Sequence, residues 1–244
     1  MKHVYVALCV GMVAAGGQAG EHWSYAGETG PERWALLSPE FSSCAGQNQS
    51  PVDLQVARMI EADLAPLAFD YKSVALDLVN NGHTIQANVA PGSSLVVDGI
   101  SFALKQFHFH CPSENLMDGR SYPLEAHLVH ADADGHLAVV AVLFEEGAEN
   151  ALLRRLWSHM PKEKDASVRT EDVQINAADL LPEDRAYYRY NGSLTTPPCT
   201  EGVRWLVCKQ PVTLSPGQVE AFLHVLHHPN NRPVQPQNAR PVLK

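Results

Sequence analysis

The sequence predicts a single, mainly β domain with a few helices at its margins, and three observations support this fold class. The chain has 244 residues, which suffices for one domain with a buried core. Strand-like segments follow one another at short intervals across most of the chain. Turn-forming pairs such as Asn81-Gly82, Asp98-Gly99 and Asp134-Gly135 separate them, and we find no internal repeat or domain linker.

Each expected element follows from its local pattern. The expected strands are 68–71, 74–79, 84–88, 94–97, 102–110, 124–130, 137–145, 173–175, 187–190, 203–208 and 211–213. Leu152, Leu153 and Leu156 at helical spacing predict a helix over 150–160. Ser215-Pro216, a good N-cap and first-turn pair, predicts another over 215–227. Residues 21–49 are aromatic and loop-like, and we expect this arm to pack on a sheet that it does not join.

The first 20 residues differ in kind from the rest. A short basic start is followed by apolar residues 4–15 and then by small residues, which is the order of a secretory signal peptide. About a dozen apolar residues are too few for a membrane span, which needs roughly 20. We therefore expect cleavage near Ala19 or Gly20, a mature domain over 21–244, and a periplasmic or secreted location. A buried helix or a membrane anchor is the alternative for this segment, and no later run is apolar enough to span a membrane.

Composition narrows the class of function. Apolar residues make up 45% and charged residues 18%, as in an ordinary globular protein. The net charge of −9, without a basic cluster, argues against a nucleic-acid partner. The signal peptide would remove Cys9, and the remaining four cysteines permit a disulfide in an exported protein. The spacing does not give the pairing, and four free buried thiols remain an alternative.

The segment Gln106-Phe107-His108-Phe109-His110 alternates polar and aromatic residues, which is typical of a strand with two different faces. His108 and His110 share one face and lie about 7 Å apart along the backbone. Both rings can therefore reach one ion at about 2 Å per bond. The pair alone is equally compatible with two half-exposed histidines.

A second alternating strand contains Glu125 and His127, and sixteen residues lie between His110 and His127. This spacing allows an antiparallel return that brings His127 opposite the first pair as a third ligand. Three neutral histidines leave a fourth tetrahedral position for water, as in catalytic rather than structural zinc sites. Imidazole also suits copper, iron and nickel, so the ligands favour zinc without proving it.

Two further polar residues share these faces. Gln106 stands two residues before His108, and Glu125 two residues before His127. Each could accept a hydrogen bond from the non-ligating ring nitrogen and fix its tautomer. A surface carboxylate is the alternative for Glu125. His130, at odd spacing from His127, should point to the opposite face.

At these residues the sequence resembles the α-carbonic anhydrase family, in its exported bacterial form. The matching segments occur in the family's order from about residue 21 to 240. They are His22-Trp23-Ser24-Tyr25, Gln47-Asn48-Gln49-Ser50-Pro51, Asn80-Asn81-Gly82-His83, Gln106 to His110, Glu125-x-His127, Gly192 to Cys199, and Asn231 to Pro236. The resemblance implies a large twisted, mostly antiparallel sheet, with the zinc in a conical cleft.

The resemblance also implies the reaction and its residues. A zinc-bound hydroxide would attack carbon dioxide to give bicarbonate and a proton. Thr195 matches the residue that accepts the hydroxide's hydrogen bond, and Glu114 the carboxylate that binds that threonine. Thr196 should face the bicarbonate. The apolar wall that holds carbon dioxide matches Val129, Val139, Leu194 and Trp205.

The family's proton shuttle matches His83, and the residues that order the connecting waters match Tyr25, Asn81 and Gln86. Gln86 stands where better-known animal members have asparagine. Histidine suits such a shuttle because its ordinary pKa lies near the working pH. His224, His227 and His228 occur late in the second expected helix, where a surface position is the simpler interpretation.

Cys44 and Cys199 match a disulfide of bacterial members, and such members imply that the chain can form a homodimer. We expect Cys111 to be reduced and not a ligand, and Cys208 to be buried.

Two other functions remain open at this stage. His108-x-His110 with Glu114 resembles a cupin metal motif of iron or manganese oxygenases, although it leaves His127 unexplained. The other is a non-catalytic binding protein on the same fold, although such members usually lack a ligand histidine.

Overall fold

The protein is described by a computed structural model that covers residues 22–244. The predicted signal peptide therefore lies outside the described residues. The strands along them are β1 (Asp53–Leu54), β2 (Ala68–Asp70), β3 (Val74–Asn80), β4 (Ile85–Asn88), β5 (Ser94–Val97), β6 (Ile100–His110), β7 (Leu116–Met117), β8 (Leu124–Ala131), β9 (Leu137–Glu146), β10 (Ser167–Ile175), β11 (Tyr187–Ser193), β12 (Glu201–Cys208) and β13 (Val212–Leu214).

The helices are short and few. The α-helices of residues 22–244 are α1 (Trp34–Leu37), α2 (Ala151–Trp157) and α3 (Pro216–Leu226). The 3-10 helices are η1 (Gly27–Thr29), η2 (Pro39–Ala45), η3 (Val56–Arg58) and η4 (Ala177–Leu180). The side chain of Asn150 caps α2 by accepting from two backbone amides, and Ser215 and Gln218 form a capping box at the start of α3.

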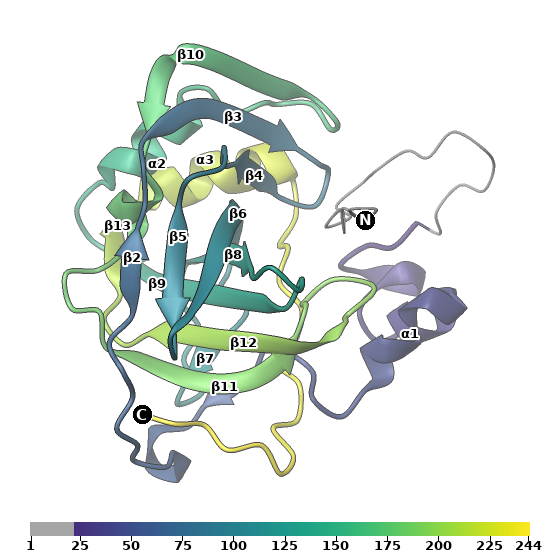
Figure 1. Cartoon of the computed structure of the whole chain (residues 1–244). Helices are drawn as coiled ribbons and strands as arrows, with labels where there is room; N and C mark the ends of the chain where they lie inside the picture. Colours follow the sequence, from purple (N-terminus) through teal and green to yellow (C-terminus); the bar gives the residue numbers. More distant parts are fainter. Residues whose placement is uncertain (1–21) are drawn as a thin grey trace, which may run out of the picture.

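One large sheet of eleven strands dominates the molecule (Figure 1). Its central order is β10-β3-β4-β6-β8-β9-β12-β11, with β5 beside β6, β2 beside β5, and β13 beside β9. All pairs are antiparallel except those of β9 with β12 and with β13. Strands β2, β5 and β6 stand upright in Figure 1 whereas β11 and β12 run across, so the sheet is strongly twisted. The predicted fold class is therefore confirmed.

The two faces of the sheet bury different cores. Helices α2 and α3 cover one face, where Phe109 lies edge to face with Trp157 of α2 at a ring-centroid distance of 5.0 Å. Alternate residues of β6 and β8 fill this core because successive side chains in a strand point to opposite faces. The other face of β6 and β8 carries the histidines. It is closed partly by a second apolar cluster around Trp205 and Val139.

The register between β6 and β8 positions the site. His108 pairs directly with His127, and His110 pairs with Glu125. Because directly paired residues of antiparallel strands point to the same face, all four side chains project to one side of the sheet. His130 of β8 projects to the other side, as its odd spacing from His127 predicts, and it is fully buried there.

The N-terminal arm lies beside the sheet, with α1 at its tip (Figure 1). Buried Trp34 packs in this arm together with Cys44 and Cys199. Arg232, from the C-terminal segment, is also buried and donates hydrogen bonds to Ser50 O and Cys44 O. The arm is therefore attached to the body by polar contacts as well as by apolar packing.

Two local differences from the sequence analysis have simple causes. Strand β10 begins at Ser167, six residues before the start that we expected at residue 173. The prediction missed its first half because those residues are mostly polar and exposed, at the edge of the sheet. An edge strand with both faces wet lacks the apolar alternation that marks a buried strand. In the arm, α1 and η2 were not predicted, since helices this short have no periodicity to detect.

Candidate metal centre and cleft

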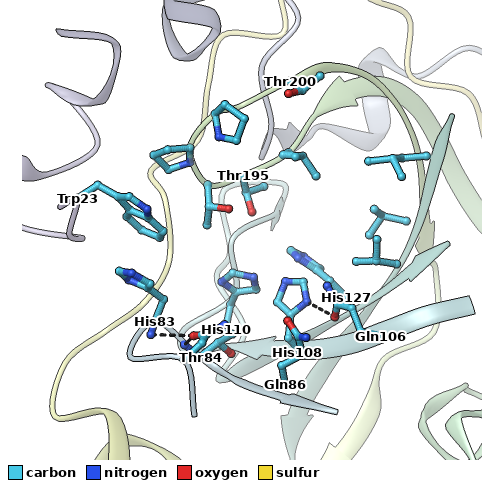
Figure 2. Close-up of a pocket in the computed structure, with 18 of the residues that line it drawn as sticks. Trp23, His83, Thr84, Gln86, Gln106, His108, His110, His127, Thr195 and Thr200 are labelled. Carbon is cyan, nitrogen blue, oxygen red and sulfur yellow. Dashed lines mark hydrogen bonds between the residues drawn. The ribbon is translucent and has the colours of Figure 1, made fainter. Parts of the chain in front are cut away.

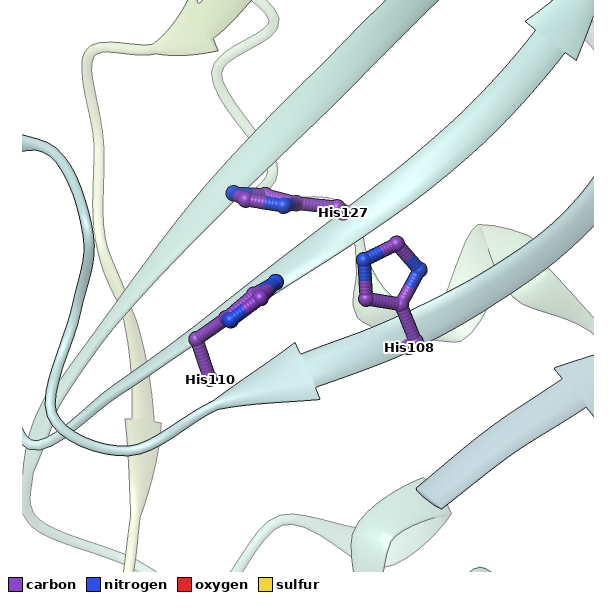
Figure 3. Close-up of side chains that lie close together, drawn as sticks. All are labelled: His108, His110 and His127. Carbon is purple, nitrogen blue, oxygen red and sulfur yellow. The ribbon is translucent and has the colours of Figure 1, made fainter. Parts of the chain in front are cut away.

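Three histidine side chains lie close together (Figure 3), and all three line one cleft. One nitrogen from each of His108, His110 and His127 lies within 4.8 Å of the others. His108 and His110 come from the end of β6 and His127 from β8, so two paired strands hold the cluster rigidly. His110 and His127 are each 1% exposed, whereas His108 is partly open to the cleft.

The nitrogens that face away from the cluster have oxygen partners. Nδ1 of His108 donates to Gln106 Oε1 at 2.8 Å. Nδ1 of His110 donates to the backbone carbonyl of Asn230, also at 2.8 Å. Nε2 of His127 lies 3.0 Å from Glu125 Oε1, but the two atoms are not aligned as a hydrogen bond. The hydrogen bonds of His108 and His110 select the tautomer that leaves the other ring nitrogen with a free lone pair, and the carboxylate beside His127 favours a hydrogen on Nε2 there.

The free nitrogens fit a metal cation. Among the described residues Nε2 of His110 has no hydrogen-bond partner although it is completely buried. An unpaired buried acceptor is costly unless something binds it. Burial and the neighbouring rings hold the pKa of His108 and His127 well below the ordinary value, and burial lowers the pKa of His110. Three neutral imidazoles are the donor set that zinc takes in catalytic sites.

Glu125 is itself held by hydrogen bonds. The backbone amides of Glu114 and Asn115 donate to its Oε2 at 2.7 and 2.8 Å, and Asn115 Nδ2 donates to Oε1 at 2.6 Å. Burial raises the pKa of Glu125, and these hydrogen bonds oppose that rise. Asn115 was not predicted, although it directly follows Glu114. Its role comes from the loop conformation, which its residue type does not reveal.

The cleft above the histidines has a volume of about 360 Å³ (Figure 2). The structure brings together nearly all the residues that the sequence analysis assigned to it. Those lining the cleft are Tyr25, Asn81, His83, Gln86, Gln106, His108, His110, His127, Val129, Val139, Leu194, Thr195, Thr196 and Trp205. Residues that the sequence analysis did not assign also line it: Trp23, Thr84, Gly135, Leu137, Pro197, Pro198 and Thr200. One wall is apolar and the other polar.

Glu114 lies behind the cleft rather than in its lining. It is fully buried, and its Oε1 accepts a hydrogen bond from the backbone amide of Arg232 at 2.8 Å. Burial raises the pKa of Glu114 well above its ordinary value, while Arg232 and the hydroxyl of Thr195 act in the opposite direction. Oε2 has no well-aligned hydrogen bond within residues 22–244, so the contact with Thr195 is loose in this conformation.

At the mouth of the cleft the ring of His83 lies flat on Trp23, with centroids 3.8 Å apart and planes 9° apart. Figure 2 shows the two rings facing each other beside the cleft. Burial, with smaller contributions from Lys164, His22 and His228, lowers the pKa of His83 to about 4. Gln86 donates to Asn88 at 2.7 Å, so its amide is partly engaged along its own strand.

Comparison with known proteins identifies the family. A family model described as eukaryotic-type carbonic anhydrase matches residues 29–244. The chain belongs to the carbonic anhydrase family. A carbonic anhydrase of Pectobacterium carotovorum is 48% identical over 225 residues, which cover 91% of this chain and 90% of that protein. One of Neisseria gonorrhoeae is 44% identical over 247 residues, covering 99% of this chain and 95% of that protein.

Solved structures agree with the family assignment. The α-carbonic anhydrase of Thermovibrio ammonificans, in complex with the inhibitor sulfanilamide, is 51% identical and has a TM-score of 0.90, covering 93% of this chain and all of that one. The chain is accordingly a carbonic anhydrase enzyme, and hydration of carbon dioxide is its family's general reaction. The alternative function of a cupin-type oxygenase is therefore wrong for this chain. Glu114 is not part of the three-histidine cluster but lies behind the cleft.

Within the carbonic anhydrase fold the cysteines divide into two kinds. Cys44 and Cys199 form a disulfide that joins the arm to the loop after Thr195 and Thr196. Cys111 and Cys208 are buried and unbridged, and burial raises the pKa of their thiols to about 11 and about 12. A disulfide is typical of exported proteins. From residue 22 onward, no helix is both long enough and apolar enough to cross a membrane.

Proposed function

We propose that this carbonic anhydrase hydrates carbon dioxide reversibly at a zinc ion held by His108, His110 and His127. The observation that carries the proposal is the convergence of three neutral, oriented ring nitrogens, one of them buried without a partner, at the floor of a cleft. Zinc bound there would act as a Lewis acid that makes a coordinated water nucleophilic near neutral pH. The remaining position of the tetrahedron would open toward the cleft.

Thr195 would orient the nucleophile. Since Oε1 of Glu114 already accepts from the Arg232 amide, its Oε2 is the oxygen available to the Thr195 hydroxyl. An ionised carboxylate only accepts hydrogen bonds, so a threonine that donates its hydrogen to Glu114 can only accept on its cleft side. Thr195 would then accept a hydrogen bond from the attacking oxygen and aim a lone pair at the substrate.

The apolar wall would hold the substrate. Carbon dioxide is small and has no net charge, so it gains from a surface that binds water weakly. Val129, Val139 and Trp205 are almost fully buried and line the cleft beside His127, and Leu194 completes this wall. Thr196 faces the same space and can bond the bicarbonate product.

His83 would carry away the proton that each hydration releases. Against Trp23 its ring binds a proton weakly, as the low pKa shows, so it gives one up readily there. Turned into the cleft water, the ring would escape that burial and accept the next proton. Tyr25, Asn81 and Gln86 line the same cleft as His83 and the histidine cluster, and they would order the connecting waters.

We also propose that the chain is exported through the signal peptide of residues 1–20 and acts in the periplasm or outside the cell. The Cys44–Cys199 disulfide supports this location, since reducing compartments keep most thiols free. Homodimer formation remains a prediction.

Zinc content and carbon dioxide hydration, measured on the same preparation before and after chelation, test the function. We expect one zinc per chain, with activity lost on chelation and restored by zinc. His127→Ala should lose both properties, whereas His224→Ala, which removes an exposed histidine outside the cleft, should keep them. Full zinc retention by His127→Ala, or stoichiometric iron in the active protein, would overturn the assignment.

A further inference from the structure

His228 lies beside Tyr25, a residue that lines the cleft, on the segment that follows α3. Helix α3 ends at Leu226, and His227 adopts a left-handed backbone that turns the chain back toward the sheet. His228 is exposed, whereas Asn230, two residues later, is fully buried. The segment therefore presents one imidazole to solvent from a fixed base.

Asn230 fixes this base to the residues of the site. Its Nδ2 donates to the carbonyl of His83 and to that of Phe109, each at 2.9 Å. Its Oδ1 accepts from the Cys111 amide, and its own carbonyl accepts from Nδ1 of His110. One buried side chain thus joins the turn that carries His83 to the segment that carries His228.

Tyr25 is close to both imidazoles. Its ring centroid is 6.3 Å from that of His83 and 6.2 Å from that of His228. One or two waters can bridge polar groups at separations of this order.

The free nitrogen of His228 can be identified. Its Nδ1 lies 2.8 Å from the carbonyl oxygen of Pro229. A carbonyl oxygen only accepts, so Nδ1 carries the hydrogen and Nε2 keeps its lone pair. His228 is therefore held in the tautomer that can take a proton at Nε2.

We propose that His228 is an outer proton carrier, which receives protons from His83 and passes them to buffer. This step rests on the proposed hydration reaction and on His83 as the inner carrier. The proton leaves the imidazolium of His83, crosses the water beside Tyr25 and binds Nε2 of His228. A buffer base then removes it from Nε2, and both rings return to the neutral state.

The charges around His83 support alternate occupation of the two rings. After burial, the causes that lower the pKa of His83 are the neighbouring Lys164, His22 and His228, while Asp165 raises it. A proton on His228 therefore discourages another on His83 until the first has left. His22 is the rival carrier because it is also exposed and close enough to influence His83.

Stopped-flow hydration of carbon dioxide by the zinc enzyme tests the relay. In dilute buffer His228→Gln should lower kcat by about threefold or more while kcat/KM is unchanged, because proton export follows the hydration step. Concentrated imidazole should restore kcat. His224→Gln, which removes an exposed histidine of α3, should match the wild type. In zinc-free protein, His228→Gln should also raise the pKa of His83 measured by NMR.

Several outcomes would overturn the relay. An unchanged kcat of His228→Gln in dilute buffer would exclude His228, and so would a loss of kcat that imidazole does not rescue. A loss of kcat in His22→Gln, with none in His228→Gln, would exclude it as well. A wild-type enzyme without zinc-dependent hydration would instead overturn the proposed function itself. The two failures are therefore distinguishable.

Discussion

Oε1 of Glu125 lies 3.0 Å from Nε2 of His127, and both side chains are buried between two paired strands. As an acceptor, the carboxylate favours a hydrogen on Nε2 of His127 and leaves Nδ1 free. Asn115 and two backbone amides donate hydrogen bonds to the carboxylate from behind. The proposed third ligand thus lies against a carboxylate that hydrogen bonds hold in place.

Glu125→Gln should weaken zinc binding about 10- to 100-fold without unfolding the protein, since partners behind a ligand typically contribute this much. The neutral amide reduces the basicity of His127 and can present an N–H where an acceptor is needed. Competition with a chromophoric chelator measures the zinc Kd. Glu220→Gln, at an exposed position of α3, is the control. Equal zinc affinity in the two variants would contradict the role given to Glu125.

Trp23→Ala should raise the pKa of His83 from about 4 toward the ordinary histidine value. Removing the indole exposes the imidazole to water and lifts the main cause of the depression, which is burial. NMR titration of zinc-free protein reads this pKa directly. Trp23→Phe, which keeps an aromatic face, should give a smaller rise. An unchanged pKa of His83 in Trp23→Ala would show that stacking on Trp23 does not cause the low pKa.

His130 should make the protein less stable in mild acid. Burial lowers its pKa from 6.5 to about 4, so the unfolded chain takes up the proton first as pH falls. Its contribution is fully present above pH 6.5 and is lost as pH falls to about 4. The loss amounts to about 3 kcal/mol.

Urea unfolding of zinc-free protein at several pH values between 7 and 4 measures this dependence. His130→Gln should flatten it relative to the wild type, and its amide can still bond the Tyr71 hydroxyl that meets His130 at 2.7 Å. His224→Gln, an exposed control on α3, should keep the wild-type slope. Identical slopes in all three proteins would refute the prediction.

Reduction of the Cys44–Cys199 disulfide should lower the free energy of unfolding by about 2–5 kcal/mol. The bridge joins residues 155 positions apart, so opening it frees a long loop in the unfolded chain. Denaturant unfolding with and without reductant measures the loss. The Cys44→Ala/Cys199→Ala variant should not respond to reductant, and a wild-type protein equally insensitive would count against the bridge as a stabiliser.

Alternation along the strands made much of this structure predictable. It placed Gln106 beside His108 and Glu125 beside His127, and it turned His130 away. These relationships depend on a period of two residues, which a single sequence displays directly. The partners that the family resemblance supplied, such as Glu114 and Thr195, come from loops and have no such period.

Other parts of the site could not be predicted from the sequence, because they too depend on loop positions that follow no regular period. Asn115 and Asn230 act through loop and backbone positions fixed by contacts distant in the sequence. Trp23 stacks on His83 from an arm with no regular structure of its own. The polar first half of β10 at the sheet edge carries no burial signal at all. Tertiary packing, and not local propensity, determines these features.

The contacts of the C-terminal segment make assembly of the centre a late event in folding. Strands β6 and β8 are joined through residues 111–123, so their pairing is far more local in sequence than the contacts of the C-terminal segment and costs less chain entropy. His110 nevertheless takes its orientation from the carbonyl of residue 230, and Glu114 from the amide of residue 232. A nascent chain therefore carries the ligands long before it can hold a metal in the final geometry. The geometry of the three histidines is complete only when the segment around residues 230–232 has docked.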